Sequence, residues 1–245
     1  MHTLKLTVEY DGTHFFGFQR QKSHRTVQEE LENALRRFLH EPVTVHGAGR
    51  TDSGVHAVHQ TAHIKIKNGM PAEAVRKALN GILPRDVAVK KVEEVPSNFH
   101  ARFSARGKVY QYFIWNSRVR SPLNESIAWQ YPVKLDVEKM KQAAHKIAGK
   151  RDFKSFQSSG SKKEMGTVRH LSRLEISKKG PLISFKFEGN GFLYNMVRNI
   201  VGTLVWVGEG KRSPGDLDLI LASKDRRKAG PTAPAKGLFL VKVKY

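Results

Sequence analysis

The feature that most constrains the fold of this chain is the order in which two kinds of hydrophobic spacing alternate along it. Residues 4–10 alternate between apolar and polar side chains, a period of two that predicts a strand with one buried face, and residues 58–66 also have the character of a strand. Between these stretches, residues 27–39 carry apolar side chains at helical spacing. A helix over residues 71–82 and a strand over residues 87–92 continue the order. It predicts an α/β or α+β layer in which helices cover one side of a sheet.

Two local signals add detail to this first half. The run Thr26-Val27-Gln28-Glu29 matches a capping box, in which two side chains cap the free N–H groups of a helix start, so the helix is expected to begin there. Val43 and Val45, which follow Pro42, predict a short strand leading into a glycine-rich loop.

The second half mixes strands and helices again, and we expect two subdomains, residues 1–105 and 106–245. The expected elements are strand 108–115, helix 136–148, hairpin strands 167–177 and 182–188, helix 192–207, a helix opening at Ser213-Pro214, and strand 239–245. Residues 157–166, rich in Ser, Gly and Lys, are expected to form a mobile, cationic surface loop.

The chain is strongly basic. Its 43 Lys and Arg residues against 22 Asp and Glu give a net charge of +21. Such a surplus favours nucleic acid or an anionic membrane surface as partner, and we expect nucleic acid. Basic clusters at Lys150-Arg151, Lys162-Lys163 and residues 224–228 are candidate phosphate contacts, which would make binding sensitive to salt.

Composition excludes several other classes of protein. There is no run of 18 apolar residues, so a spanning helix is excluded, and the first residues lack the apolar core of a secretory signal. The chain has no cysteine. This rules out disulfides, thiolate metal sites and cysteine nucleophiles, and it fits a cytoplasmic location.

The glycine-rich run from Gly47 to Gly54 places one carboxylate, Asp52, near one guanidinium, Arg50. A dinucleotide fingerprint is rejected, because Asp52 stands where its third glycine would be and would repel a pyrophosphate. A phosphate-binding P-loop is also rejected, since no Gly-Lys-Ser/Thr follows. Residue types alone leave two interpretations open: a tight turn whose acid caps backbone N–H groups, or a reactive acid presented on a loop.

Three histidines in the following segment, His56, His59 and His63, suggest a metal site at first sight. A zinc site needs three or four ligands, and this spacing is not that of a helical H-E-x-x-H motif. We expect no metal here, and assign the histidines to packing or RNA contacts.

Five blocks of sequence, in order, resemble the TruA family of tRNA pseudouridine synthases. The strongest is Gly49-Arg50-Thr51-Asp52-Ser53-Gly54-Val55-His56-Ala57, which is similar to the active-site motif of that family. The others are residues 10–21, 99–105 with 108–112, 192–202, and 229–238. Two departures are visible: Ser53 stands where the family often has alanine, and His100 where it often has aspartate, so the contribution of position 100 is open.

The resemblance implies an α+β fold with two ferredoxin-like subdomains that form an extended, mostly antiparallel sheet, with helices on one face and a central catalytic cleft. It implies an isomerase that converts uridine to pseudouridine at positions 38, 39 and 40 in the anticodon stem-loop of tRNA, working as a homodimer. This reaction breaks the C1′–N1 bond, rotates the uracil and joins C1′ to C5. It involves no redox change, so no cofactor is expected.

The resemblance also implies residue roles. Asp52 is the essential catalytic residue, although residue types do not tell whether it attacks C1′, attacks C6, or assists a glycal route. Arg198 matches an active-site arginine that would favour the ionised form of Asp52 and contact substrate. Arg50 is expected to contact the displaced nucleotide, and Tyr110 to receive the extruded base. The alternatives from the residues alone are a loop ion pair for Arg50, a surface arginine for Arg198 and a core tyrosine for Tyr110.

Two other functions compete with this assignment. A non-catalytic tRNA-binding protein fits the charge equally well, but it gains nothing from an acid such as Asp52, which repels phosphate. A nucleoside or glycoside hydrolase would usually need a second carboxylate. Glu41 is the nearest acid on the N-terminal side of Asp52.

Overall fold

The computed structural model describes residues 1–67, 69–160 and 166–245, which form ten strands and five α-helices. Contacts within the chain divide it into two units. Unit 1 comprises Met1–Arg106 together with Phe239–Tyr245, and unit 2 comprises Gly107–Leu238. The cluster Lys162-Lys163 and part of the expected loop over residues 157–166 lie outside the described residues.

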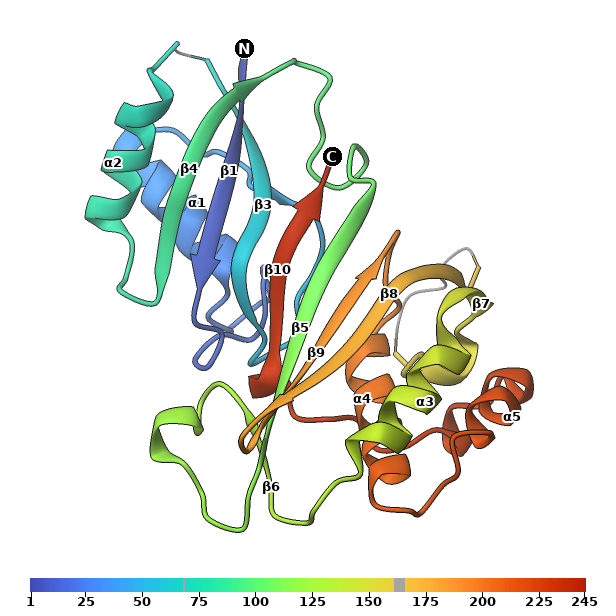
Figure 1. Cartoon of the computed structure of the whole chain (residues 1–245). Coiled ribbons are helices and arrows are strands. Elements are labelled where there is room, and N and C mark those ends of the chain that lie inside the picture. The colour runs from blue at the N-terminus through green and yellow to red at the C-terminus, as the bar shows by residue number, and fades with distance from the viewer. Residues whose placement is uncertain (68, 161–165) are drawn as a thin grey trace. The chain divides into compact units, whose positions relative to one another are not determined.

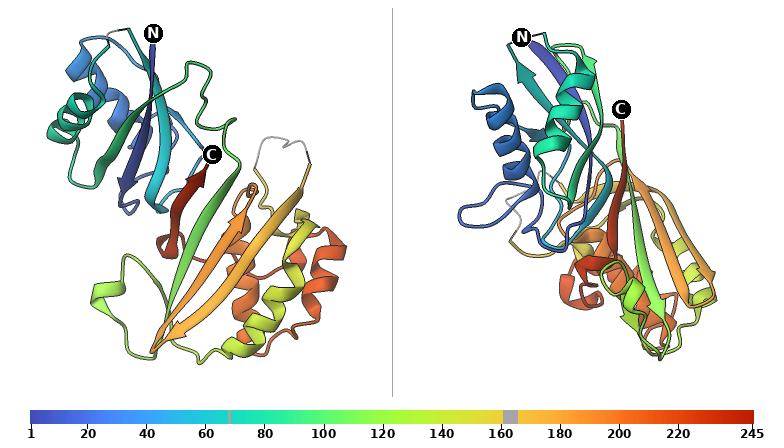
Figure 2. Two further views of the ribbon diagram at one scale, coloured as in Figure 1. Left: turned by 45° about the horizontal axis from the view of Figure 1, so that its top comes forward. Right: turned by 90° about the vertical axis from the view of Figure 1, so that its left-hand side faces the viewer.

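Unit 1 is a sheet covered on one face by two helices (Figures 1 and 2). Its strands lie in the order β4-β1-β3-β10, with β2 also paired to β3. The pairs β1–β3, β1–β4 and β2–β3 are antiparallel, whereas β10 runs parallel to β3. The elements are β1 (His2–Tyr10), α1 (Val27–Leu39), β2 (His46–Gly47), β3 (His56–Ile66), α2 (Ala72–Ile82), β4 (Val87–Val95) and β10 (Leu238–Lys244).

The core of unit 1 lies between its sheet and its helices. Alternate residues of β1 are fully buried, as the period of two predicts, and they pair with buried residues of β3: Leu4 with Ile64, and Leu6 with Ala62. From α1, Leu31 is also fully buried. These apolar faces are the ones that the hydrophobic spacing of the sequence indicated.

Helix α1 begins at the predicted residue but is capped by a different mechanism. Thr26 occupies the N-cap position, yet its side chain makes no capping hydrogen bond, and its Oγ1 is buried without a hydrogen-bond partner among the described residues. Instead, the N–H groups of Val27 and Gln28 donate to the backbone carbonyls of Gly17 and Phe18, at 3.3 and 2.9 Å. The predicted capping box is therefore wrong, because the preceding loop already satisfies the free donors of the helix start.

Unit 2 has a second sheet with strand order β5-β9-β8-β7, in which each neighbouring pair is antiparallel, and a short β6 runs parallel to β5. Three helices cover one face of it (Figures 1 and 2). The elements are β5 (Gly107–Asn116), β6 (Trp129–Tyr131), α3 (Val137–Ile147), β7 (Gly149–Asp152), β8 (Val168–Lys179), β9 (Leu182–Gly189), α4 (Met196–Gly208) and α5 (Asp216–Ser223). Tyr112, Phe185, Phe187 and Ile200 are fully buried in its core.

Helix α4 begins four residues later than the sequence predicts. Asn195, its N-cap, has a left-handed backbone with φ of 59°, which interrupts the helical run expected from Phe192 onward. The strand expected at Val43 and Val45 is also displaced, since β2 covers only His46–Gly47. The α+β class with a mostly antiparallel sheet is confirmed. None of the helices in the described ranges is long and apolar enough to cross a membrane.

Candidate active site

The loop that carries Asp52 is anchored from both sides by backbone hydrogen bonds. Thr51 accepts from the N–H of Phe18 at 3.2 Å through its carbonyl, and its hydroxyl bonds the Tyr10 hydroxyl at 2.8 Å. On the other side, the N–H of Gly54 donates to the carbonyl of Phe15 at 3.1 Å. The segment after β1 therefore fixes the loop immediately before and after Asp52.

Glycines allow these two segments to touch. A Cβ at Gly12 would lie 2.0 Å from the carbonyl oxygen of Val55, and a Cβ at Gly17 would lie 2.4 Å from that of Thr51. Gly17 also has a φ of 89°. Both contacts are with backbone, which has little freedom to move away, so only glycine fits at either position. Gly12 and Gly17 belong to the site, and sequence analysis assigned them no role.

The carboxylate of Asp52 is presented on this fixed loop. Thr51 beside it is buried, Asp52 itself is half-buried, and Ser53 is exposed. The backbone N–H of Val55 donates to the carbonyl of Asp52 at 3.1 Å, which closes a turn. Arg50, on the same loop, is exposed, and in the described part of the chain it forms no ion pair. The loop thus holds an accessible acid with its backbone determined on either side.

The histidines near this loop have structural partners. The ring of His56 stacks on Phe239 at 4.6 Å and accepts the N–H of Gly12 at 3.0 Å. His59 donates from Nδ1 to the carbonyl of Val241 at 3.0 Å. Among the described residues, no group of three or more His, Cys, Asp or Glu side chains is arranged to hold a metal ion.

His46, His63 and His100 form a cluster. The rings of His46 and His63 stack with centroids 4.9 Å apart, and the ring of His100 lies 4.6 Å from that of His63 at a tilt of 59°. Burial, reinforced by the charges of His100, His46 and Lys65, lowers the pKa of His63 to about 4. The pKa of His100 is also lowered, mainly by burial. Both rings are therefore neutral at pH 7.

The structure explains what position 100 contributes. Nδ1 of His100 accepts the backbone N–H groups of Arg102 and Phe103, at 3.1 and 3.4 Å. These bonds cap the turn that follows β4. An aspartate at this position has acceptor oxygens suited to the same task. His100 is therefore a turn-capping residue.

The remaining two residues expected at the site, Tyr110 and Arg198, belong to unit 2. Tyr110 lies on β5 and is only 8% exposed. Its ring meets Phe192 edge to face, with centroids 5.1 Å apart. The side chain is thus part of a packed aromatic pair in the RNA-free protein.

Arg198 lies in the first turn of α4 and is clamped by two acceptors. Its Nε donates to the carbonyl of Ala233 at 2.7 Å, and its Nη1 donates to Oδ1 of Asn195 at 3.0 Å. The segment that carries Ala233 is pressed against α4, since a Cβ at Gly202 would lie 1.8 Å from the carbonyl oxygen of Pro231. Arg198 is half-buried, and these two hydrogen bonds restrain its guanidinium.

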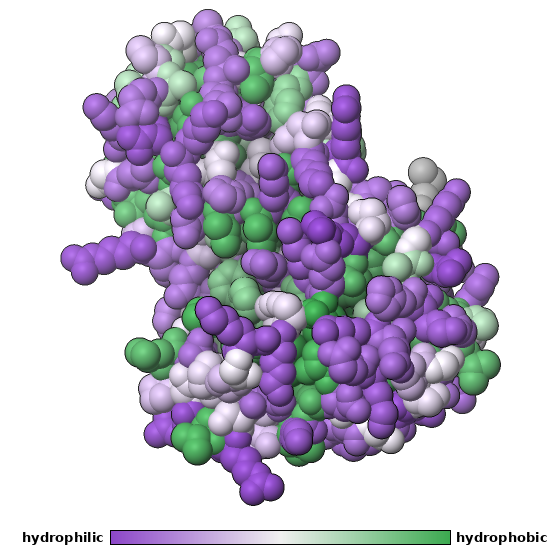
Figure 3. All heavy atoms as spheres, in the orientation of Figure 1, coloured by the Kyte–Doolittle hydropathy of each residue, from purple (hydrophilic) through white to green (hydrophobic). Residues whose placement is uncertain are grey.

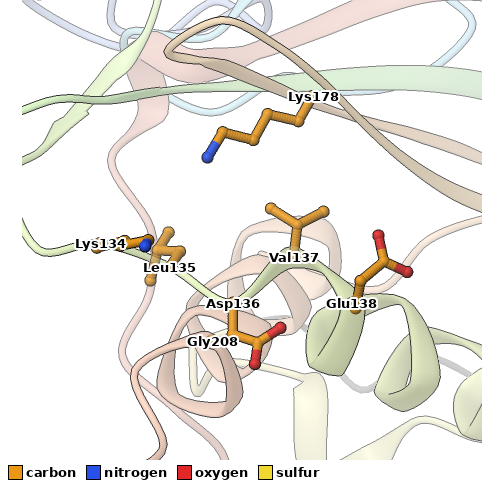
Figure 4. Close-up of a pocket in the computed structure, with 7 residues that line it drawn as sticks. All are labelled: Lys134, Leu135, Asp136, Val137, Glu138, Lys178 and Gly208. Atoms are coloured by element: carbon orange, nitrogen blue, oxygen red, sulfur yellow. The ribbon is translucent and has the colours of Figure 1, made fainter.

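Unit 2 also has a surface pocket of about 420 Å³ at the start of α3 (Figure 4). It is lined by Lys134, Leu135, Asp136, Val137, Glu138, Lys178 and Gly208. Two lysines and two carboxylates give its rim no preference for either sign of charge. It contains none of the residues expected at the site.

Within each unit, then, the structure groups the expected residues in pairs. Arg50 and Asp52 share one loop of unit 1, and Tyr110 and Arg198 both lie in unit 2.

Sequence reasoning missed Asn195 as a partner of Arg198. The signal available was the spacing of three residues between them, which places two side chains on one side of a helical turn.

Comparisons with known proteins identify the family of this chain. A family model described as tRNA pseudouridine synthase matches residues 6–104 and 143–245, which include Arg50, Asp52 and Arg198 but not Tyr110. Three relatives named tRNA pseudouridine synthase A are similar over nearly the whole chain. The protein of Thermoanaerobacter sp. (strain X514) is 45% identical, with 100% of both chains covered. That of Geobacillus kaustophilus is 46% identical over 99% of this chain and 94% of its own. That of Paramagnetospirillum magneticum is 45% identical over 100% of this chain and 96% of its own.

Among solved structures, one chain of a Cbf5-Nop10-Gar1 complex aligns with 97% of this chain over 48% of its own length, at 12% identity and a TM-score of 0.42.

Proposed function

The chain belongs to the tRNA pseudouridine synthase family, and we propose on that premise that it isomerises uridine to pseudouridine in tRNA, at positions 38, 39 and 40 of the anticodon stem-loop. The observation that carries the proposal is the placement of Asp52. It is an accessible carboxylate on a loop whose backbone is fixed immediately before and after it. In a chain of net charge +21, such an acid works against RNA binding unless it takes part in chemistry.

The reaction balances without any added reagent. The C1′–N1 bond of the uridine breaks, the uracil rotates, C1′ bonds to C5, and the proton on C5 leaves to the solvent while N1 gains one. A carboxylate is suited to covalent catalysis at an electrophilic carbon. Three routes for Asp52 are compatible with this balance: attack at C1′, attack at C6, or assistance to a glycal intermediate.

Three further residues serve the substrate in this proposal. Arg50, exposed on the loop of Asp52, contacts the displaced nucleotide. Arg198, held by Asn195 and the carbonyl of Ala233, binds the substrate. Tyr110 receives the extruded base, which cannot react while it is stacked in a helix.

Loss of the C5 hydrogen gives a direct test. With tRNA carrying 5-tritiated uridine, the wild-type protein should release tritium. Asp52→Ala and Asp52→Asn should bind tRNA with unchanged affinity. They should release tritium at least about 10³-fold more slowly than the wild type, because they lack the ionised acid.

Ser53→Ala is the matched control for this test. It changes the neighbouring exposed residue and should keep wild-type turnover. Release by both wild type and Asp52→Ala would contradict the catalytic role of Asp52. No release by the wild type, with tRNA still bound, would favour the non-catalytic tRNA-binding protein instead.

We also infer that the protein works as a homodimer in the cytoplasm. The first part rests on the resemblance to the TruA family. The second is supported by the absence of cysteine, which is typical of chains that need no disulfide. Sedimentation at micromolar concentration should give twice the mass of one chain.

A further inference from the structure

We propose that Asn195 is a positioning residue for Arg198. It holds the guanidinium in place by connecting it through hydrogen bonds to a buried polar network around Ser158 and Asn199. The inference rests on the proposed function, because it assigns Asn195 a part in the same reaction. It is drawn from contacts within unit 2 alone.

The orientation of the Asn195 side chain follows from the chemistry of its neighbours. An arginine can only donate hydrogen bonds, so the atom facing Nη1 of Arg198 at 3.0 Å must be the amide oxygen Oδ1. The amide nitrogen then faces Ser158, and Nδ2 donates to Oγ of that serine at 3.2 Å. Asn195 therefore links Arg198 to Ser158 with one acceptor and one donor.

Ser158 is itself held by a buried residue. Asn199 is completely buried, and its Nδ2 donates both to the carbonyl of Phe156 at 2.8 Å and to Oγ of Ser158 at 3.2 Å. Its Oδ1 accepts from Nη2 of Arg226 at 2.9 Å and from the hydroxyl of Thr232 at 2.6 Å. All four hydrogen-bonding positions of the Asn199 amide are used, so this network has one arrangement.

The backbone of Asn195 gives the link its direction. Its φ of 59° and ψ of 7° place it in the left-handed region immediately before α4, where asparagine is among the few side chains tolerated. Glycine would adopt the same backbone without a side chain. The backbone requirement and the side-chain link can therefore be separated by substitution.

An arginine side chain that binds substrate loses the rotational freedom of several bonds on binding, unless that freedom is already restricted in the free protein. Oδ1 of Asn195 is a side-chain acceptor for Arg198, and it ties the guanidinium to the buried network through Ser158. Removing it takes away the hydrogen bond at Nη1 and with it this link. The expected effect is on the chemical step, since misplacement of a substrate-positioning group reduces rate more than affinity.

Asn195→Gly keeps the left-handed backbone and deletes the link. Under single-turnover conditions with 5-tritiated tRNA, we expect its rate to fall about 10- to 100-fold, with tRNA affinity within about threefold of wild type. Asn195→Asp keeps an acceptor for Arg198 and should retain a rate within about fivefold of wild type. Ser158→Ala removes the far end of the link without touching residue 195 and should slow the reaction about three- to tenfold, which provides a second test if the glycine variant does not fold.

His40→Gly is the matched control, because His40 also has a left-handed backbone, with φ of 56°, and lies in unit 1 at the end of α1. It should leave the rate unchanged. Wild-type rates for both Asn195→Gly and Ser158→Ala would overturn the inference, and so would an Asn195→Asp rate as low as that of the glycine variant. If wild-type protein releases no tritium, the proposed function fails and the inference falls with it; an active wild type with active variants rejects the inference alone.

Discussion

Tyr110 is the most deeply buried of the residues expected at the site, and its role can be tested at the scale of one side chain. The ring is 8% exposed and packs edge to face on Phe192. To receive a base, it must present a ring face in the complex with RNA. A base stacked on an aromatic ring gains about 1–3 kcal/mol.

We predict that Tyr110→Ala slows tritium release about 100-fold and weakens tRNA binding by less than about threefold, because most of the RNA contact is made elsewhere. Tyr110→Phe keeps the ring and separates stacking from any transfer of a proton by the hydroxyl. Because truncation of a buried ring costs about 3–5 kcal/mol of stability, thermal unfolding of each variant must be measured beside its rate. A folded alanine variant with full activity would reject the assignment.

At this scale, the sequence indicates side chains but not their partners. Resemblance identifies Asp52 and Arg198, whereas the helical spacing predicts that Asn195 lies inside a continuous helix. The helical spacing runs unbroken through Asn195, and the residue that fixes its amide, Ser158, lies 37 positions earlier in the chain. A contact of that separation leaves no local pattern. The role of His100 is local, since its ring accepts the N–H groups of Arg102 and Phe103, but histidine is not a residue type that by itself indicates a turn cap.

At the scale of elements, the cluster of His46, His63 and His100 joins the turn after β4 to strands β2 and β3. Nδ1 of His63 accepts the N–H of Ala101 at 3.2 Å, which requires the neutral ring. Burial and the charges of His46, His100 and Lys65 lower the pKa of His63 to about 4, from 6.5. Between these two values, the unfolded chain binds a proton at His63 that the folded chain does not.

We therefore predict that the contribution of His63 to the free energy of unfolding is fully present above about pH 6.5. This contribution falls as the pH drops toward 4, by at most about 3 kcal/mol. Urea unfolding of wild type and His63→Gln should be compared at pH 7 and pH 4.5. The variant should lose less stability between the two pH values than the wild type, since other titrating groups are common to both. Equal losses would show that His63 does not contribute.

The elements that the sequence predicted well are those with an extended apolar period, such as β1 and α1. The ones that it missed are short or polar. Strand β7 (Gly149–Asp152) has almost no apolar side chain, and β6 (Trp129–Tyr131) has three residues, so neither shows a period. The capping box at Thr26 failed because its donors are taken by carbonyls of Gly17 and Phe18, in a loop whose path depends on the Asp52 loop.

At the scale of the whole molecule, charge is the dominant property. Hydrophilic residues cover most of the face shown in Figure 3, and the chain carries a net charge of +21. When such a protein binds RNA, its Lys and Arg side chains displace the cations condensed on the phosphate backbone. Binding therefore releases salt ions into solution. The composition was sufficient to predict the class of partner, whereas nothing in it indicates which stem or loop is recognised.

We predict that tRNA affinity falls at least tenfold between 50 and 200 mM monovalent salt. Lys150 and Arg151, both exposed on β7, should each contribute about one unit to the slope of log affinity against log salt concentration. The double variant Lys150→Ala/Arg151→Ala should lower that slope by about two, and Glu138→Gln, which alters an exposed charge on α3, is the control for a general charge effect. A slope independent of the two residues would place RNA on another surface.

The pairing of β10 with β3 affects how the protein is made. Strand β10 begins at Leu238, and its partner β3 ends at Ile66. During translation, the edge of β3 that will receive β10 stays without this neighbour until β10 has been made, and unit 2 is produced in between. An unpaired strand edge attracts other chains, so the nascent protein is most exposed to misassociation during this interval.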